Sequence, residues 1–226
     1  MSLAHAISHQ LGLPSIPSFT PIVFVIDEDI FVRASLELLI QSQGWHAETF
    51  ASPQEFLSRP QPLVPSCLIL ALSAPDGNGI EAQKRIARER AGIPIIVTSS
   101  YEDIPTTVQA MRAGAVDFLV KPLSNDALLS GIRQSLERSR AVLDAERGVR
   151  DLQNSYATLT PRERQVMTLV VSGLLNKQVG GELGISEITV KAHRGQVMHK
   201  MKANSLADLV RMAVKIRPAR QAIHLA

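Results

Sequence analysis

Residues 22–29 read IVFVIDED, so that five apolar side chains run directly into three carboxylates. The apolar run has the length of a buried strand, and Val32, Leu36 and Leu39 recur at helical spacing before Gly44 ends the pattern. The segment therefore predicts a strand, an acidic loop and a helix, in that order. Carboxylates at such a strand end are typical of ligand-binding edges in open parallel sheets.

The same alternation of strand and helix continues along the chain. Further apolar runs predict four strands, at residues 45–50, 67–72, 93–98 and 116–120. Between them, helical patterns follow the capping box Ser52-Pro53-Gln54-Glu55 and occupy residues 80–90 and 104–113. Five strands alternating with helices predict an α/β fold, a flavodoxin-like doubly wound five-stranded parallel sheet with helices on both faces.

Polar side chains gather at the predicted strand ends. Asp27 and Glu28 follow the first strand, Thr98 ends the fourth and Lys121 follows the fifth, whereas the third strand ends at Ala71. Since the carboxyl ends of parallel strands meet at one edge, we expect these residues to converge. Carboxylate oxygens hold Mg²⁺, and a hydroxyl and an ammonium hold phosphate oxygens, so this edge is equipped for a phosphoryl group.

Composition indicates a globular chain of two domains. The 226 residues are 45% apolar and 20% charged, and the length exceeds the roughly 100 to 200 residues of one domain. No apolar run approaches the roughly 20 residues that span a bilayer, and residues 1–20 lack the features of a secretion signal. The single cysteine, Cys67, excludes an internal disulfide. We therefore expect a cytoplasmic protein without membrane contact.

The net charge of +3 is unevenly distributed. Residues 1–155 carry 13 Lys and Arg against 17 Asp and Glu, whereas residues 156–226 carry 11 against 4. A basic module attached to a mildly acidic one suggests a polyanion as the partner of the basic module. The alternative is that the surplus of Lys and Arg only solvates the surface.

The basic module has the pattern of a helix-turn-helix. Thr160-Pro161-Arg162-Glu163 combines a capping box with proline at the first helical position. Asn176 can cap a second helix, Gly184 permits a tight turn, and Ser186 can cap a third helix that runs to about Met201. The other interpretation of the same caps is an ordinary three-helix packing unit.

The third of these helices has two different faces. On a 3.6-residue wheel its buried side is formed by Val190, Val197 and Met201. Its outward side carries Ile188, Ala192, Gly195 and His199, and the hydrogen-bond donors Lys191 and Gln196 flank them. Such a face fits the DNA major groove, where Lys191 can bond guanine, Gln196 adenine, and Ala192 a thymine methyl group. Gly195 lowers helix propensity, a loss that close approach to a ligand explains.

The first module contains the blocks VFVIDEDIFVRASL, CLILALSAPDGNGIEAQ, IIVTSS and GAVDFLVKP. Together they resemble the receiver domain of two-component response regulators, over roughly residues 21–140. The resemblance implies that Asp27 and Glu28 are the metal-binding pair and that Lys121, before a cis proline, binds phosphate. It also implies that Thr98 is the switch hydroxyl and Phe118 the switch aromatic.

One residue of the receiver pattern is missing. The phosphate-accepting aspartate would end the third strand, where this chain has Ala71, whose methyl group neither attacks phosphorus nor binds a metal. Phosphotransfer at that position is thus excluded. Ser73 is a poor substitute because it needs a base to activate it, and Asp76 because it lies five residues further along, in a loop. With only Asp27 and Glu28 left, we expect at most weak Mg²⁺ binding, and Lys121 is expected to offset their charge.

Two explanations of Ala71 stay open. It belongs either to a naturally degenerate receiver that answers to a protein or a small molecule, or to an Asp to Ala replacement made to block phosphorylation. A second departure is one extra residue between Thr98 and Asp103 relative to the commonest receiver spacing, which affects how Thr98 or Ser99 is aimed.

The second module, at residues 159–213, reads LTPRERQVMTLVVSGLLNKQVGGELGISEITVKAHRGQVMHKMKANSLADLVRMA. This stretch resembles the LuxR-type DNA-binding domain of NarL/FixJ response regulators, which implies double-stranded DNA as partner and binding as a homodimer. The side chains that the resemblance assigns to DNA phosphates or groove edges are Lys177, Thr189, Lys191, Arg194 and Lys200. We count Asn176, at the start of the second helix, as a further candidate DNA-binding residue. The last helix, from about Ser205, would form the dimer contact.

We therefore predict a DNA-binding transcription regulator, and no enzyme, whose receiver works independently of phosphorylation. Its predicted parts are a tail (1–20), a receiver-like domain (21–140), a helical linker (141–158) and the helix-turn-helix domain (159–226). A helical pattern from about Asn125 to Leu152 is either a packed last helix or, less well supported, a dimer seam broken at Ser139 and Glu146.

Two rivals come from other functional classes. A Mg²⁺-dependent phosphoryl-transfer enzyme would use the acidic loop after the first strand, yet no nucleophile or substrate pocket is evident in the sequence. A protein-interaction module would sequester a partner regulator through an exposed face of the receiver.

Overall fold

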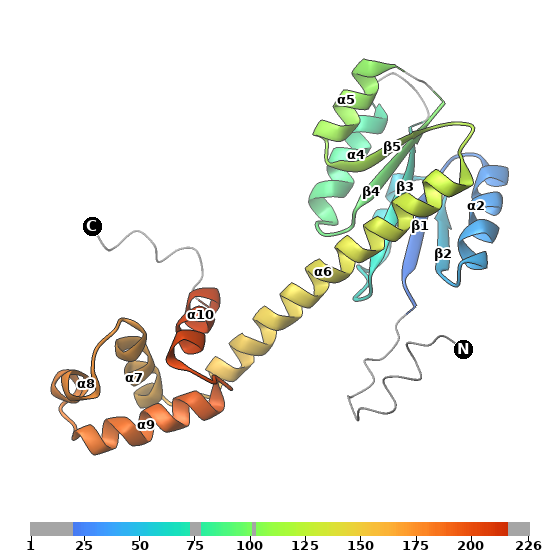
Figure 1. Cartoon of the computed structure of the whole chain (residues 1–226). Helices are drawn as coiled ribbons and strands as arrows, with labels where there is room; N and C mark the ends of the chain where they lie inside the picture. The colour runs from blue at the N-terminus through green and yellow to red at the C-terminus, as the bar shows by residue number, and fades with distance from the viewer. Residues whose placement is uncertain (1–19, 73–77, 101–102, 217–226) are drawn as a thin grey trace. The chain divides into compact units, whose positions relative to one another are not determined.

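A computed structural model describes residues 20–72, 78–100 and 103–216 of the chain (Figure 1). The chain divides into two compact units, with the division between Leu143 and Asp144. The predicted tail lies outside the described residues except for Thr20, and so do the candidate acceptors Ser73 and Asp76. Among the described helices, none combines the length and the hydropathy that a membrane crossing requires.

The first unit contains one sheet of five parallel strands. Its strands are β1 (Ile22–Ile26), β2 (His46–Phe50), β3 (Ser66–Leu72), β4 (Ile95–Ser99) and β5 (Ala115–Val120). The order across the sheet is β2-β1-β3-β4-β5, and every neighbouring pair is parallel. The doubly wound parallel sheet predicted from the strand and helix pattern is confirmed, with strand boundaries within about two residues of those expected.

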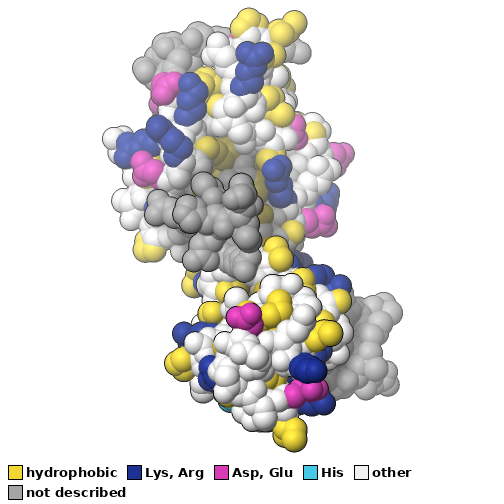
Figure 2. All heavy atoms as spheres, turned by 90° about the vertical axis from the view of Figure 1, so that its left-hand side faces the viewer, with side chains coloured by type: hydrophobic (Ala, Val, Ile, Leu, Met, Phe, Trp, Pro, Cys, Tyr) yellow, Lys and Arg dark blue, Asp and Glu magenta, His cyan; other side chains and the backbone are white. Residues whose placement is uncertain are grey.

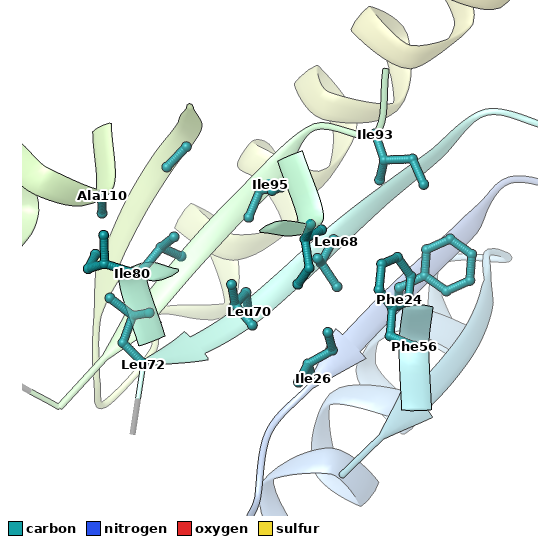
Figure 3. Close-up of a cluster of buried hydrophobic side chains, with 13 residues drawn as sticks. Phe24, Ile26, Phe56, Leu68, Leu70, Leu72, Ile80, Ile93, Ile95 and Ala110 are labelled. Carbon is teal, nitrogen blue, oxygen red and sulfur yellow. The ribbon is translucent and has the colours of Figure 1, made fainter. Parts of the chain in front are cut away.

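Both faces of the sheet are covered by helices. These are α2 (Ile30–Ser42), α3 (Pro53–Ser58), α4 (Asn78–Glu89), α5 (Ile104–Arg112) and the first part of α6 (Asn125–Ala157). Side chains alternate along β1, so that Phe24 and Ile26 join a cluster with Phe56 on α3, as Figure 3 shows. Val23 and Val25 point the other way, into a core shared with α2 and α6.

Helix α6 extends to Ala157, five residues beyond the predicted end. Its buried side chains Leu128, Ile132 and Leu136 belong to the sheet core, as expected for a packed last helix. The break in the apolar stripe at Ser139 has a local reason, because the buried Ser139 hydroxyl accepts the backbone N–H of Ser66 at 3.1 Å. The hydroxyl thus satisfies the first residue of β3, which an apolar side chain would leave unbonded.

The second unit holds four further helices. They are α7 (Pro161–Val171), α8 (Asn176–Leu183), α9 (Glu187–Lys200) and α10 (Leu206–Ile216). The predicted capping box at Thr160 and Glu163 and the cap at Ser186 are both present. The predicted cap at Asn176 is wrong.

At the start of α8 the capping residue is Leu175. The side-chain oxygen of Gln178 accepts a hydrogen bond from the Leu175 backbone N–H at 2.8 Å. A residue inside α8 thus supplies the acceptor for a backbone donor at the start of the helix. Asn176 is instead the first residue of the helix, and its side chain bonds elsewhere, as described below.

Candidate strand-end pocket and DNA-binding helix

The carboxyl edge of the sheet brings together several of the predicted receiver residues. In the strand register, Ile26 lies beside Leu70 and Ala71 lies beside Thr98. Asp27, the residue after β1, is buried, and its Oδ2 lies 2.6 Å from Nζ of Lys121. Lys121 follows β5, where its backbone N–H donates to the Ser99 carbonyl at 2.8 Å. A buried carboxylate and an ammonium therefore meet across the sheet edge.

The other oxygen of Asp27 is also engaged. Oδ1 accepts the backbone N–H of Asp29 at 3.0 Å. A residue that the sequence analysis missed, Arg33, donates to the carbonyl oxygens of Asp27 at 2.6 Å and of Glu28 at 3.0 Å. Arg33 lies one turn into α2 beyond Asp29, whose carboxylate caps that helix. The Arg33 side chain of α2 thus holds the acidic loop through the backbone carbonyl groups of the loop.

The residues present do not fit a tightly held Mg²⁺ ion, which the receiver domain family would use. Asp27 gives both oxygens to protein donors, Glu28 is exposed, and a methyl group stands at Ala71. In the part of the chain that the structure describes, His, Cys, Asp and Glu side chains nowhere gather in a group of three suited to a metal. Hard cations take six or more oxygen ligands, of which this edge offers few.

The remaining receiver residues are placed as follows. Thr98 is almost fully buried, with 1% of its surface exposed. Phe118 is partly buried and packs against the cluster of Figure 3. The Lys121–Pro122 peptide bond is cis, as the resemblance implied. Residues 101 and 102, within the segment that carries the extra residue, lie outside the described part of the chain.

The two faces of α9 are those that the wheel predicts. Val190, Val197 and Met201 are buried with at most 1% exposed. The predicted DNA-facing side chains that are exposed are Lys177, Thr189, Lys191, Ala192, Gly195 and Gln196. Lys191 is 61% exposed and pairs with Glu187 one turn earlier at 3.0 Å. The lower part of Figure 2, which is the helical unit, shows Lys and Arg side chains on its surface.

Comparison with known proteins gives the family. A model described as "Response regulator receiver domain" matches residues 23–133, and one described as "Bacterial regulatory proteins, luxR family" matches residues 157–213. Nodulation protein W of Bradyrhizobium diazoefficiens is 48% identical over 192 residues, covering 85% of each chain. Transcriptional regulatory protein FixJ of the same organism is 37% identical over 85% of this chain and 94% of its own length.

The chain belongs to the LuxR/FixJ type of response regulators. The solved structure of the response regulator StyR matches it with a TM-score of 0.76 and 42% identity, over 87% of this chain and 100% of that one. This response regulator is accordingly a DNA-binding protein of two-component signalling. Its family acts in transcription regulation and not as enzymes, which removes the support for the phosphoryl-transfer rival.

Three of the predicted DNA-binding residues make internal contacts in this response regulator. Arg194 Nη1 donates to Oδ1 of Asn176 at 3.2 Å, which joins α9 to the start of α8. Lys200 Nζ bonds both carboxylate oxygens of Glu163, at 2.9 and 2.7 Å. The structure therefore separates exposed predicted residues from Asn176, Arg194 and Lys200, whose polar atoms hold helices together.

A glycine that the sequence analysis did not single out shapes the helix-turn-helix. A Cβ atom on Gly180 would lie 2.7 Å from the carbonyl oxygen of Ile185, too close for any other residue. Gly184 ends α8 in the left-handed conformation, with φ of 64°. The signal in the sequence was the pair Gly180-Gly181 inside a helical pattern, because glycine in a helix interior costs about 1 kcal/mol and needs a packing reason.

Proposed function

We propose that this response regulator controls transcription without being phosphorylated at residue 71. The observation that carries the proposal is the contact of 2.6 Å between Lys121 and Asp27 at the strand edge where Ala71 stands. The lysine that would bind a phosphoryl group is held by a carboxylate of the same chain, and the acceptor carboxylate is absent. A protein or small molecule that binds one state of the receiver better than another would then set its activity.

The DNA-binding side of the proposal is α9 in the major groove of double-stranded DNA. Lys191 would bond guanine, Gln196 adenine and Ala192 a thymine methyl group. Lys177 and Thr189, both exposed near helix N-termini, would contact backbone phosphates. Gly195 is exposed with open space at its Cβ position, which supports close approach of the DNA to α9.

We further propose that the protein binds DNA as a homodimer through α10. Val214 on this helix is 69% exposed and Leu206 is 38% exposed, which leaves apolar surface available for a second copy. The FixJ relatives are named transcriptional regulatory proteins, which supports control of transcription. Because the partner is DNA, we place the activity in the cytoplasm.

The experiment is selection of bound fragments from genomic DNA with the full-length protein, followed by binding measurements on the enriched sequence. Lys191→Met is expected to weaken binding about tenfold and to relax the preference at one base pair. The matched control Lys84→Met removes an exposed lysine from α4 and is expected to leave the affinity unchanged. Enrichment of no sequence, or equal effects of the two variants, would contradict the proposal.

Phosphorylation is tested on the same protein with acetyl phosphate and Mg²⁺. The chain with Ala71 is expected to incorporate no acid-labile phosphate, whereas Ala71→Asp, which places a carboxylate beside Asp27, is expected to incorporate it. Acid-labile phosphate on the chain that carries Ala71 would overturn this part of the proposal.

A further inference from the structure

A lysine at the end of α9 forms an ion pair with a glutamate in the first turn of α7, beside the apolar packing of Val197 and Met201 against Met167. Lys200 is the last residue of α9, and Glu163 lies 37 positions earlier, in the first turn of α7. Nζ of Lys200 lies 2.9 Å from Oε1 and 2.7 Å from Oε2 of Glu163, and 3.4 Å from the carbonyl oxygen of Thr158. An ammonium has three N–H donors, and these three oxygens take all of them.

Glu163 serves both helices with one carboxylate. Its side chain is 6% exposed, and Oε2 also accepts the backbone N–H of Thr160 at 2.8 Å, which completes the capping box of α7. The bond from Lys200, followed by that from Thr160, lowers the pKa of Glu163 below its ordinary value. The carboxylate therefore stays ionised, and Lys200 is the cation that compensates it inside the unit.

The other lysines assigned to DNA are in a different situation. Lys191 is 61% exposed and its partner Glu187 is 45% exposed, so water and DNA reach both. The side chain of Lys200 is 28% exposed, and its donors are turned toward α7. A phosphate could bind Lys200 only by displacing a buried carboxylate, which would leave Glu163 as an uncompensated buried charge.

We propose that Lys200 is a positioning residue for DNA binding and makes no phosphate contact. With Glu163 it fixes the C-terminal end of α9 against α7, while Arg194 and Asn176 fix the middle of α9 against α8. The two attachments together set the angle at which Lys191, Ala192 and Gln196 face a groove. The inference rests on the proposed base-reading role of α9 and changes the role of Lys200 within it.

Salt dependence of DNA binding separates the two roles. A lysine on a phosphate releases a counterion, so its removal lowers the slope of log K against log salt by about 1 and weakens all sequences alike. A positioning residue acts through the base contacts, so its removal weakens the selected sequence and leaves non-specific binding and the slope unchanged. The full-length protein is therefore titrated with the selected fragment and with a scrambled one at several salt concentrations.

The variants are Lys200→Met, Glu163→Gln, their combination and Lys200→Arg, with Lys177→Met as the reference for a phosphate contact. Each is measured at a temperature where circular dichroism shows that it is folded. Lys200→Met and Glu163→Gln are each expected to weaken specific binding about tenfold with an unchanged slope, and the double variant no more than either. Lys200→Arg, which can bond the same carboxylate, is expected to restore most of the affinity.

Three results would overturn the proposal. A slope lowered by about 1 in Lys200→Met, with Glu163→Gln binding normally, would put Lys200 on a phosphate. Full affinity of the folded Lys200→Met protein, with only its melting temperature reduced, would make the pair a matter of stability alone. Additive losses in the double variant would show that the residues act separately. If the unsubstituted chain shows no preference for any fragment, the proposed base-reading role of α9 fails, and this outcome differs from each of the three results above.

Discussion

Each of the two units contains a largely buried lysine–carboxylate pair, and the two pairs have nearly the same distance between nitrogen and oxygen. Lys121 and Asp27 are 2.6 Å apart with 24% and 8% of their side chains exposed, and Lys200 and Glu163 are 2.7 Å apart with 28% and 6% exposed. Their surroundings differ. Asp27 lies at the sheet edge that carries the expected phosphate-binding residues of the receiver domain. Glu163 instead caps α7 and bonds Lys200 at the end of α9.

The comparison shows that the distance between a lysine and a carboxylate does not by itself indicate the role of the ion pair. At the sheet edge, the acceptor carboxylate is replaced by the methyl group of Ala71. Lys121 therefore bonds the carboxylate of Asp27 instead. In the helical unit the pair connects two helices, and its carboxylate also satisfies a helix terminus. We therefore expect the two pairs to respond differently to the same substitutions.

The largest effect on stability is expected for Glu163→Ala. The substitution strands the Lys200 ammonium and leaves the Thr160 N–H without its acceptor, and breaking a mostly buried pair of this kind is expected to cost about 2 to 3 kcal/mol. The loss of unfolding free energy is measured by urea unfolding, monitored through hydrogen exchange of the backbone amides of α7 and α9. The single tryptophan, Trp45, reports the sheet unit in the same experiment and serves as the internal control.

The pH dependence of the same pair is the second prediction. Because the bond from Lys200 lowers the pKa of Glu163 from its ordinary value of 4.5, the unfolded state binds protons more readily than the folded state. The stability from this carboxylate is therefore fully present above about pH 4.5 and is lost as the pH falls through the lower folded pKa. The stability of the unsubstituted chain relative to Glu163→Gln, which does not titrate, should shrink below about pH 4.5. A difference that stays constant down to pH 3 would contradict the account.

The sheet and its register were predictable because their signals are local. The strand IVFVI at residues 22–26 and the buried run that ends at Leu72 are apolar on both faces, as a covered parallel sheet requires. The convergence of Asp27 and Lys121 followed from topology alone, since parallel strands end at one edge. The extension of α6 to Ala157 was missed, because Asn154 and Ser155 near its end have low helix propensity.

The internal contacts of the helical unit were not predictable in the same way. The capping box identified Glu163 as a cap, but nothing local indicates that its carboxylate also meets Lys200, 37 residues later. A wheel describes one helix and cannot show which neighbouring helix approaches its flank. For Asn176 the pattern favoured the residue type most suited to capping, whereas Gln178 reached back to Leu175 instead.

The third prediction concerns Asp27→Ala. Lys121 loses one bond to Asp27, whereas Lys200 loses two bonds to Glu163, so the cost is expected to be smaller, about 1 kcal/mol. Urea unfolding followed by Trp45 fluorescence checks it. A loss as large as that of Glu163→Ala would show that the two pairs are equivalent, against the comparison drawn above.

The smallest effect on stability is expected for the exposed pair of α9. Glu187→Ala should change the free energy of unfolding by about 0.5 kcal/mol or less, since Lys191 and Glu187 are both well exposed. The same substitution removes an acid next to the proposed groove-facing lysine, and DNA affinity is expected to rise about twofold to threefold. Fluorescence anisotropy with a labelled fragment measures the affinity, and a fall in affinity would argue against Lys191 facing DNA.

The most direct test compares the affinity of the chain with Ala71 and of Ala71→Asp for the selected DNA fragment, each with and without acetyl phosphate and Mg²⁺. The chain with Ala71 is expected to bind the fragment equally well in both conditions, because position 71 cannot accept a phosphoryl group and Lys121 is held by Asp27. Only the Ala71→Asp protein should change its affinity with the phosphoryl donor. A donor-dependent change in the chain with Ala71 would contradict the central claim.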